Sequence, residues 1–143
     1  MNFLATLAIS AMIFLSDGET TIPAVPYHDP PKHSAYAITT LFKCVEAEEG
    51  GNSYDCKYMA ASCIVNRAER WGMTLDQVIY QPFQFAVVRN GSIDNVVPTI
   101  ETKLACLRAL REPDDRVMFF SMGNRHFRYA KLIRIIDGEY FYE

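Results

Sequence analysis

The apolar residues of this 143-residue chain change their spacing near Pro113, and this change limits the fold more than any other feature. Before it, apolar residues recur every three or four positions, which is typical of amphipathic helices. After it, the segments RVMFFSM and RIIDGEYFYE are rich in aromatic and β-branched residues, which favour strands. We therefore expect an α+β fold, with a helical core first and a small antiparallel sheet formed mainly by the C-terminal segment.

Capping residues and helix-ending glycines and prolines divide the first part into four helices. The expected helices cover residues 34–49, 54–70, 74–80 and 99–111. The buried stripe of the first is expected at Ile38, Leu41, Phe42 and Val45, that of the second at Met59, Ala60, Cys63 and Ile64, and that of the last at Ile100, Leu104, Leu107 and Leu110. The intervening PFQFAVVRNGSI is expected to be a loop or a short extended piece.

The C-terminal segment contains one strong turn signal, Asp137-Gly138, which is typical of a β-hairpin. A second pattern competes with the strand prediction in part of this region. The residues that also fit a helical stripe are Tyr129, Leu132, Ile133 and Ile136. A partly helical segment between Arg125 and Ile136 is therefore the alternative.

The N-terminal part differs in kind from the rest. Residues 3–15 form an apolar run that is too short to cross a bilayer comfortably and lies where a signal peptide has its hydrophobic region. Residues 17–33 carry four prolines and no apolar periodicity, as expected of a linker. We predict a hydrophobic leader at 1–16, a linker at 17–33 and one domain at 34–143, and therefore export to the periplasm or the cell exterior. A retained membrane anchor or a buried N-terminal helix is the alternative.

Composition and charge exclude several classes of protein. Charged residues make up 22% of the chain and aromatic residues 13%, which fits one globular domain rather than a disordered chain. The net charge of -3 argues against a nucleic-acid partner, because neutralising phosphates needs an excess of lysine and arginine. One local exception is the stretch from Arg116 to Arg134, which is basic and contains no acid. Such a surface could steer an acidic substrate, or it could be an ordinary solvated sheet face.

Four cysteines form an even set: Cys44, Cys56, Cys63 and Cys106. In an exported chain they could form two disulfides, and otherwise they are buried thiols that act as small hydrophobic residues. The spacing includes no C-x-x-C pair, so we expect no zinc site, and nothing in the sequence calls for another metal or a cofactor.

Three carboxylates, Glu46, Glu48 and Glu49, crowd the expected C-terminal end of the first helix. This is the unfavourable end for negative charge, because the last carbonyl groups of a helix already carry partial negative charge. That repulsion raises a carboxyl pKa, and burial against the apolar stripe raises it further. A raised pKa is what a general acid needs near neutral pH. The alternative for the cluster is an ordinary surface turn.

The acidic cluster and the residues after it resemble a known family. The segment EEGGNSYDCKYMAASCIVNR, followed by VIYQPFQFAVV, resembles the spore cortex-lytic enzyme (SleB-like) family of cell-wall hydrolases. The family pattern is E-A-x-G-E-x-Y-E-G, an alanine-rich helix ending in N-R, and a Y-Q-P-x-Q-F block, and the resemblance extends over residues 35–142. It implies a small lysozyme-like domain that cuts the glycan strands of peptidoglycan without a cofactor.

The resemblance also implies a reaction. It is lytic transglycosylation between N-acetylmuramic acid and N-acetylglucosamine, which leaves a 1,6-anhydro end and needs one catalytic glutamate. The motif places that role on Glu48, whereas helical periodicity slightly favours Glu49. A hydrolytic muramidase would need a second carboxylate. Candidates for it are Asp76, Asp94 and Glu139, each of which is more simply a turn or surface residue. A non-catalytic peptidoglycan-binding or structural module is the competing class.

Further site residues follow from the same resemblance. The residues predicted to bind substrate are Tyr80, Gln84, Phe85, Phe120 and Ser121, with packing of a loop or a core as their alternative role. Asn66 and Arg67 are expected to brace the catalytic turn, and Phe119 either to line the cleft or to fill the core.

The chain departs from the family pattern at several positions. Asn52 stands where the family has a second glutamate, and Cys56 where it has glycine. Residues 137–139 read Asp-Gly-Glu instead of Gly-Asn-His. The remaining histidines, His28, His33 and His126, match no catalytic position.

Overall fold

The computed structural model describes residues 32–123 and 129–143. The chain divides into two units, Met1–Lys32 and His33–Glu143, and all helices and strands below belong to the second. The predicted leader and most of the predicted linker lie outside the described residues. Within the described ranges, none of the helices has the length and apolar character needed to span a membrane.

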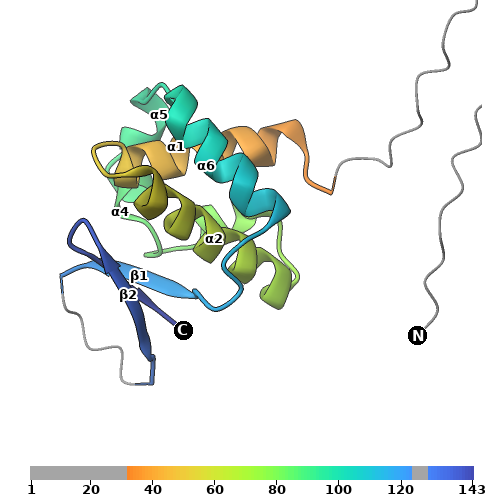
Figure 1. The fold of residues 1–143 in the computed structure, drawn as a ribbon. Helices are drawn as coiled ribbons and strands as arrows, with labels where there is room; N and C mark the ends of the chain where they lie inside the picture. Colours follow the sequence, from red (N-terminus) through yellow and green to blue (C-terminus); the bar gives the residue numbers. More distant parts are fainter. Residues whose placement is uncertain (1–31, 124–128) are drawn as a thin grey trace, which may run out of the picture. The chain divides into compact units, whose positions relative to one another are not determined.

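In the described residues, six helices precede three strands, and helices give way to strands after Pro113 as the change of pattern predicts (Figure 1). The helices are α1 (Ala35–Glu49), α2 (Tyr54–Trp71), α3 (Leu75–Ile79), α4 (Ala86–Arg89), α5 (Ser92–Asn95) and α6 (Ile100–Arg111). The four predicted helices are confirmed as α1, α2, α3 and α6. Their N-caps are Ser34, Ser53, Thr74 and Thr99, and each side chain accepts a backbone N–H of the first turn.

The prediction of a loop or extended piece after Pro82 is wrong in part, because α4 and α5 are single helical turns. Phe85, in an extended conformation, precedes α4, and Gly91, with φ 76°, separates α4 from α5. Helices of four residues are too short to produce a visible 3.6-residue period, so the sequence pattern gives no sign of them.

The predicted buried face of α6 is wrong at three of its four positions, and of these four only Leu110 packs against the core. Ile100, Leu104 and Leu107 are 76%, 54% and 44% exposed. The residues that face the core are Thr102, Ala105, Cys106 and Ala109. Helix α6 packs along α2, which is buried over most of its surface, and small side chains let two such helices approach closely.

The strands form an antiparallel sheet in the order β1-β3-β2, with β1 Phe119–Met122, β2 Leu132–Ile136 and β3 Glu139–Tyr142. The predicted hairpin turn is confirmed, since Asp137 and Gly138 have φ of 52° and 84°. The helical alternative is wrong for residues 132–136, which form β2, and Tyr129 is 93% exposed. Residues 124–128 lie outside the described part.

Two clusters of buried side chains form the core. One lies among the helices, around Leu41, Ile64 and Ile79. The other joins α2 to the sheet through Cys63 and Phe141. The sheet therefore packs on one side of α2, beside the end of α1 (Figure 1).

All four cysteines are buried free thiols, so the structure has the buried-thiol alternative and not the two disulfides. Burial raises the pKa of Cys63 to about 11 and that of Cys106 to about 12. Raised thiol pKa values make these side chains weak nucleophiles, as expected of packing residues.

Candidate active site

The three glutamates at the end of α1 have three different surroundings. Glu46 reaches the start of α6, where its Oε2 accepts hydrogen bonds from the Thr99 backbone N–H at 2.9 Å and the Thr99 hydroxyl at 3.1 Å. Although burial opposes the shift, hydrogen bonds from Thr102 and Thr99 lower the pKa of Glu46. Glu46 is thus an ionised group at a helix N-terminus, which is a stabilising arrangement.

Glu49 is 1% exposed and belongs to the turn between α1 and α2. Its Oε2 accepts hydrogen bonds from Asn52 Nδ2 at 2.6 Å and from Cys56 Sγ at 3.3 Å. Burial raises the pKa of Glu49, and the hydrogen bond from Asn52 opposes the rise. Asn52 and Cys56, two of the departures from the family pattern, are therefore both partners of this glutamate. Glu49 holds the turn together and does not line the cavity described next.

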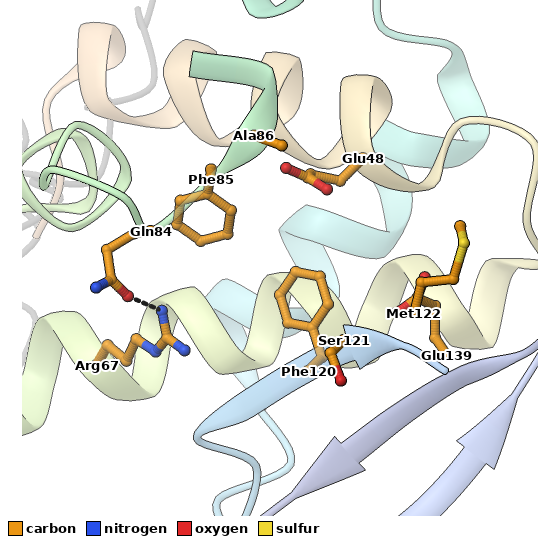
Figure 2. Close-up of a pocket in the computed structure, with 9 residues that line it drawn as sticks. All are labelled: Glu48, Arg67, Gln84, Phe85, Ala86, Phe120, Ser121, Met122 and Glu139. Atoms are coloured by element: carbon orange, nitrogen blue, oxygen red, sulfur yellow. Dashed lines mark hydrogen bonds between the residues drawn. The ribbon is translucent and has the colours of Figure 1, made fainter. Parts of the chain in front are cut away.

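Glu48 is half-buried and lines a cavity of about 260 Å³ that is open on one side (Figure 2). Burial raises the pKa of its carboxyl group, and so does the charge of Glu49, while the backbone N–H groups of Val87 and Ala86 oppose the rise. The Val87 N–H donates to Glu48 Oε1 at 3.5 Å. The carboxyl is thus held at the cavity by the start of α4, in surroundings that favour its protonated form more than water does.

Separate parts of the chain supply the walls of this cavity (Figure 2). Besides Glu48, the lining residues are Arg67 of α2, Gln84, Phe85 and Ala86 before and at the start of α4, Phe120, Ser121 and Met122 of β1, and Glu139 of β3. The rings of Phe85 and Phe120 lie 6.1 Å apart, centroid to centroid, at 43°. The cavity therefore combines apolar rings with amide, hydroxyl and carboxyl groups, as sugar-binding clefts do.

Arg67 holds two of these walls together. Its Nε donates to the Met118 carbonyl at 2.7 Å and its Nη1 to Gln84 Oε1 at 3.0 Å. The guanidinium also lies over the rings of Phe85 and Phe119, at 5.9 and 5.2 Å from their centroids. The bracing role predicted for Arg67 fits this geometry, and Phe119 packs on the guanidinium and does not line the cavity.

Asn66 has a comparable position one residue earlier. Its Nδ2 donates to the carbonyl groups of Asp114 and Val117, at 2.7 and 2.8 Å. These bonds fix the segment that leads into β1 against α2.

Of the predicted substrate-binding residues, the structure brings Gln84, Phe85, Phe120 and Ser121 to the cavity of Glu48. Tyr80 is apart from it and lines a second, smaller cavity together with Phe83. Phe85 contributes to both cavities, so the two adjoin. Phe83 is 89% exposed and has φ 64°, which is rare for a bulky residue.

The position of Glu139 differs from the expectation for a candidate second carboxylate. We expected a turn or surface residue, but Glu139 is 5% exposed and lines the cavity with Glu48. Burial raises its pKa to about 7, and the charges of Glu49 and Glu48 add to the rise. The other two carboxylates considered, Asp76 and Asp94, are not among the lining residues.

The basic stretch between Arg116 and Arg134 is partly neutralised. Arg116 pairs with Asp114 at 3.1 Å, and Arg134 lies 4.0 Å from Asp55. Residues 124–128 of this stretch, like His28 and His126, lie outside the described residues. In the part that is described, no group of three or more His, Cys, Asp and Glu residues could hold a metal ion.

Comparisons with known proteins place this geometry in context. The family model described as Cell Wall Hydrolase matches residues 51–142, a stretch that begins just after Glu48. None of the curated proteins matches the chain. Two solved structures do match: the catalytic domain of the germination-specific lytic transglycosylase SleB from Bacillus anthracis and the catalytic domain of the Bacillus cereus SleB protein.

Both matches have 23% sequence identity and cover 80% of this chain. The first has a TM-score of 0.68 and covers 100% of the SleB domain, and the second has 0.69 and covers 94%. At this identity the likeness shows a shared fold, in which helices and a small C-terminal sheet are arranged in the same way. Since the family model covers well over half of the residues, this protein belongs to the Cell Wall Hydrolase family.

Proposed function

We propose that this protein degrades peptidoglycan, and that it cuts the bond between N-acetylmuramic acid and N-acetylglucosamine as a lytic transglycosylase with Glu48 as the proton donor. The observation that carries the proposal is the position of Glu48, a half-buried carboxyl group on the wall of an open cavity lined by Phe85 and Phe120. Family membership supports an enzyme of the cell wall. One structural neighbour is described as a lytic transglycosylase, which supports the reaction type.

The chemistry needs a carboxyl group that still carries its proton near neutral pH. Burial shifts Glu48 toward this state by raising its pKa. Glu48 gives its proton to the glycosidic oxygen as the bond from that oxygen to the anomeric carbon breaks. In a route with one glutamate, the resulting carboxylate then takes the proton of the muramic-acid 6-hydroxyl, whose oxygen attacks the anomeric carbon. The products are a 1,6-anhydro end and a free 4-hydroxyl.

The lining residues have roles that fit a sugar. Phe85 and Phe120 offer ring faces for stacking, and Gln84 and Ser121 offer an amide and a hydroxyl for hydrogen bonds. We assign a more distant sugar of the same strand to the adjoining cavity of Tyr80 and Phe83.

Peptidoglycan lies outside the cytoplasmic membrane, so this function requires export. The predicted hydrophobic leader at 1–16 would provide it, placing the domain in the periplasm or outside the cell, or on a phage particle that meets the wall from outside.

A second candidate is a hydrolytic muramidase, which the position of Glu139 favours. A hydrolase needs a second carboxylate as nucleophile or as the base for a water molecule, about 5 to 9 Å from the acid. Glu139 lines the same cavity as Glu48. The product would then carry a reducing end in place of a 1,6-anhydro end.

The test is product analysis. Isolated peptidoglycan is incubated with the purified protein, and the soluble fragments are identified by mass spectrometry. We expect fragments with 1,6-anhydro ends and a loss of at least ~100-fold in the Glu48→Gln variant. The matched control is Glu112→Gln, which removes an exposed carboxyl group that does not line the cavity and should release fragments at the parent rate. Reducing ends would favour the muramidase, and release of no fragments would favour a non-catalytic module.

A further inference from the structure

Glu139 faces the helices because of the register of β3. It pairs with Met122 of β1 and Ile136 of β2, at the start of the central strand. Side chains two residues apart on a strand share a face, and Phe141, two residues on, is fully buried in the core. The sheet therefore carries the Glu139 side chain to the end of α1, into the cavity of Glu48 (Figure 2).

The Glu139 carboxyl group has few compensating contacts. Its Oε2 is buried, and none of the residues that the structure describes makes a hydrogen bond with it. A buried polar atom without a partner lowers the stability of the folded state. Structural residues rarely retain that cost, whereas groups that act on a substrate do.

The charged groups around Glu139 are mostly acidic. From α1 they are Glu48 and Glu49; α2 contributes the neutral Cys56 thiol, while Asp137 of the hairpin turn acts on Glu49 and Cys56. Arg67 of α2 lines the same cavity, and its hydrogen bonds go to Gln84 and the Met118 carbonyl. The surroundings of Glu139 therefore raise its affinity for a proton, as a general base requires.

The surroundings of Glu48 differ in one respect. Glu48 accepts a backbone N–H bond from Val87, which stabilises the carboxylate left after proton transfer, while Glu139 Oε2 has no such bond within the described residues. Glu48 is therefore the better proton donor of the two and Glu139 the better proton acceptor. The two carboxyl groups line one cavity, and the charge of Glu48 raises the pKa of Glu139. Such a pair can give one proton and take another in the same reaction.

We propose that Glu139 is the second acid–base residue of this site: it accepts the proton of the attacking hydroxyl group while Glu48 gives its proton to the glycosidic oxygen. This rests on the proposed function and divides between two residues the two proton transfers that the one-glutamate route gives to Glu48. The bond from the anomeric carbon to the glycosidic oxygen breaks, and a bond from the same carbon to the attacking oxygen forms. The reaction leaves Glu48 ionised and Glu139 protonated, and exchange with water restores the starting state.

The pKa of about 7 at Glu139 supports this role. A base is most effective when its pKa lies near the working pH, because a useful fraction is then ionised and each ion still binds a proton well. A glutamate with an ordinary pKa would be a weaker base.

The experiment compares three substitutions with the parent protein on soluble glycan strands, over a range of pH. Glu139→Gln cannot take a proton, while Glu139→Asp and Glu139→His can. We expect Glu139→Gln to lower kcat by at least ~100-fold with KM changed less than about threefold. The rise in rate near pH 7 should disappear in this variant. The Asp and His variants should each keep at least about ten times the rate of the Gln variant, with the rise moved to another pH.

Two results would overturn the assignment. The first is a Gln variant that keeps the parent rate and pH profile while Glu48→Gln is inactive, which is the one-glutamate route. The second is an equal loss in the Gln, Asp and His variants, which would give Glu139 a purely structural role. Failure of the proposed function looks different, because the parent protein would release no fragments or Glu48→Gln would keep its activity.

Discussion

The burial of Glu139 predicts how the stability of the protein changes with pH. The ordinary pKa of this carboxyl is 4.5, and burial, followed by the charges of Glu49 and Glu48, raises it to about 7 in the folded protein. Between these values the folded state binds more protons than the unfolded state. The free energy of unfolding therefore falls as the pH rises from 4.5 to about 7, and the loss is complete above that range. Glutamine cannot ionise, so Glu139→Gln removes this loss.

The size of the effect follows from the same values. At about 1.4 kcal/mol per pKa unit, the difference corresponds to roughly 3 kcal/mol if the site were fully screened from water. The cavity is open on one side, so solvent reduces the penalty to about 1 to 2 kcal/mol. We expect Glu139→Gln to be more stable than the parent by this amount near pH 8 and equal to it near pH 4.

Urea unfolding followed by the fluorescence of Trp71, the single tryptophan, measures this difference. An increase of 1 to 2 kcal/mol moves the midpoint by about 0.5 to 1 M. The exposed Glu112→Gln variant is the control and should follow the parent at both pH values. A stability of Glu139→Gln relative to the parent that is the same near pH 4 and near pH 8 would refute this reasoning. The carboxyl group would then be solvated in the folded protein, and the physical basis for its raised pKa would be wrong.

Three further predictions concern groups that position the site. Glu101→Ala leaves the Lys57 ammonium, whose side chain is 3% exposed, without its 3.1 Å partner, and should lower the free energy of unfolding by about 1 to 3 kcal/mol, measured by urea unfolding. Asn66→Ala leaves two backbone carbonyls of the segment before β1 without their donor, and a thermal melt should show a loss of about 2 to 3 kcal/mol. Gly50→Ala places a Cβ 2.5 Å from the Glu46 carbonyl oxygen, so the end of α1 must shift, and release of peptidoglycan fragments should fall by at least about tenfold with a smaller change in stability.

Local signals in the sequence were sufficient for most of the secondary structure. Helix starts could be predicted because a serine or threonine cap acts on the first turn alone, and Ser53 and Thr99 do so in the structure. The hairpin could be predicted because the backbone angles at Asp137 and Gly138 suit few other residues.

Packing between helices could not be predicted in the same way. The pattern of large apolar residues on α6 selects Leu104 and Leu107, but the helix turns Ala105 and Ala109 toward α2. Hydrophobicity ranks a leucine above an alanine, whereas the distance between two closely packed helices favours the smaller residue. The choice depends on the partner helix, which the local sequence does not contain.

The choice between Glu48 and Glu49 shows what periodicity measures. Periodicity favoured Glu49, and Glu49 is the more buried residue, held by Asn52 and Cys56. A residue in the middle of the buried stripe is enclosed by the core and cannot meet a substrate. Glu48 lies at the edge of the stripe, where a side chain is partly desolvated and still borders an open cavity. A candidate acid is therefore better sought beside the centre of an apolar stripe than within it.

Glu139 could have been found from strand alternation. It stands two residues before Phe141, and an aromatic residue that fills the core defines the face that Glu139 shares. Its place directly after a turn favoured the simpler expectation of a surface residue. A carboxyl group on the same strand face as a core aromatic residue lowers the stability of the fold. That cost is the reason to examine such a carboxyl group as a functional group.

The two carboxyl groups of the cavity lie far apart in the sequence, one in the first helix and one in the last strand, and α2 is the element that brings them together. Arg67 connects the loop before α4, through Gln84, to the entrance of β1, through the Met118 carbonyl. The sheet then carries Glu139 toward α1 through its pairing with β1. The helical part alone would have Glu48 without Phe120 and Glu139, and the sheet buries Phe141 against α2. The site therefore exists only when the C-terminal strands are docked, so undocking of the sheet would remove Glu139 and the Phe120 wall while leaving Glu48 in place.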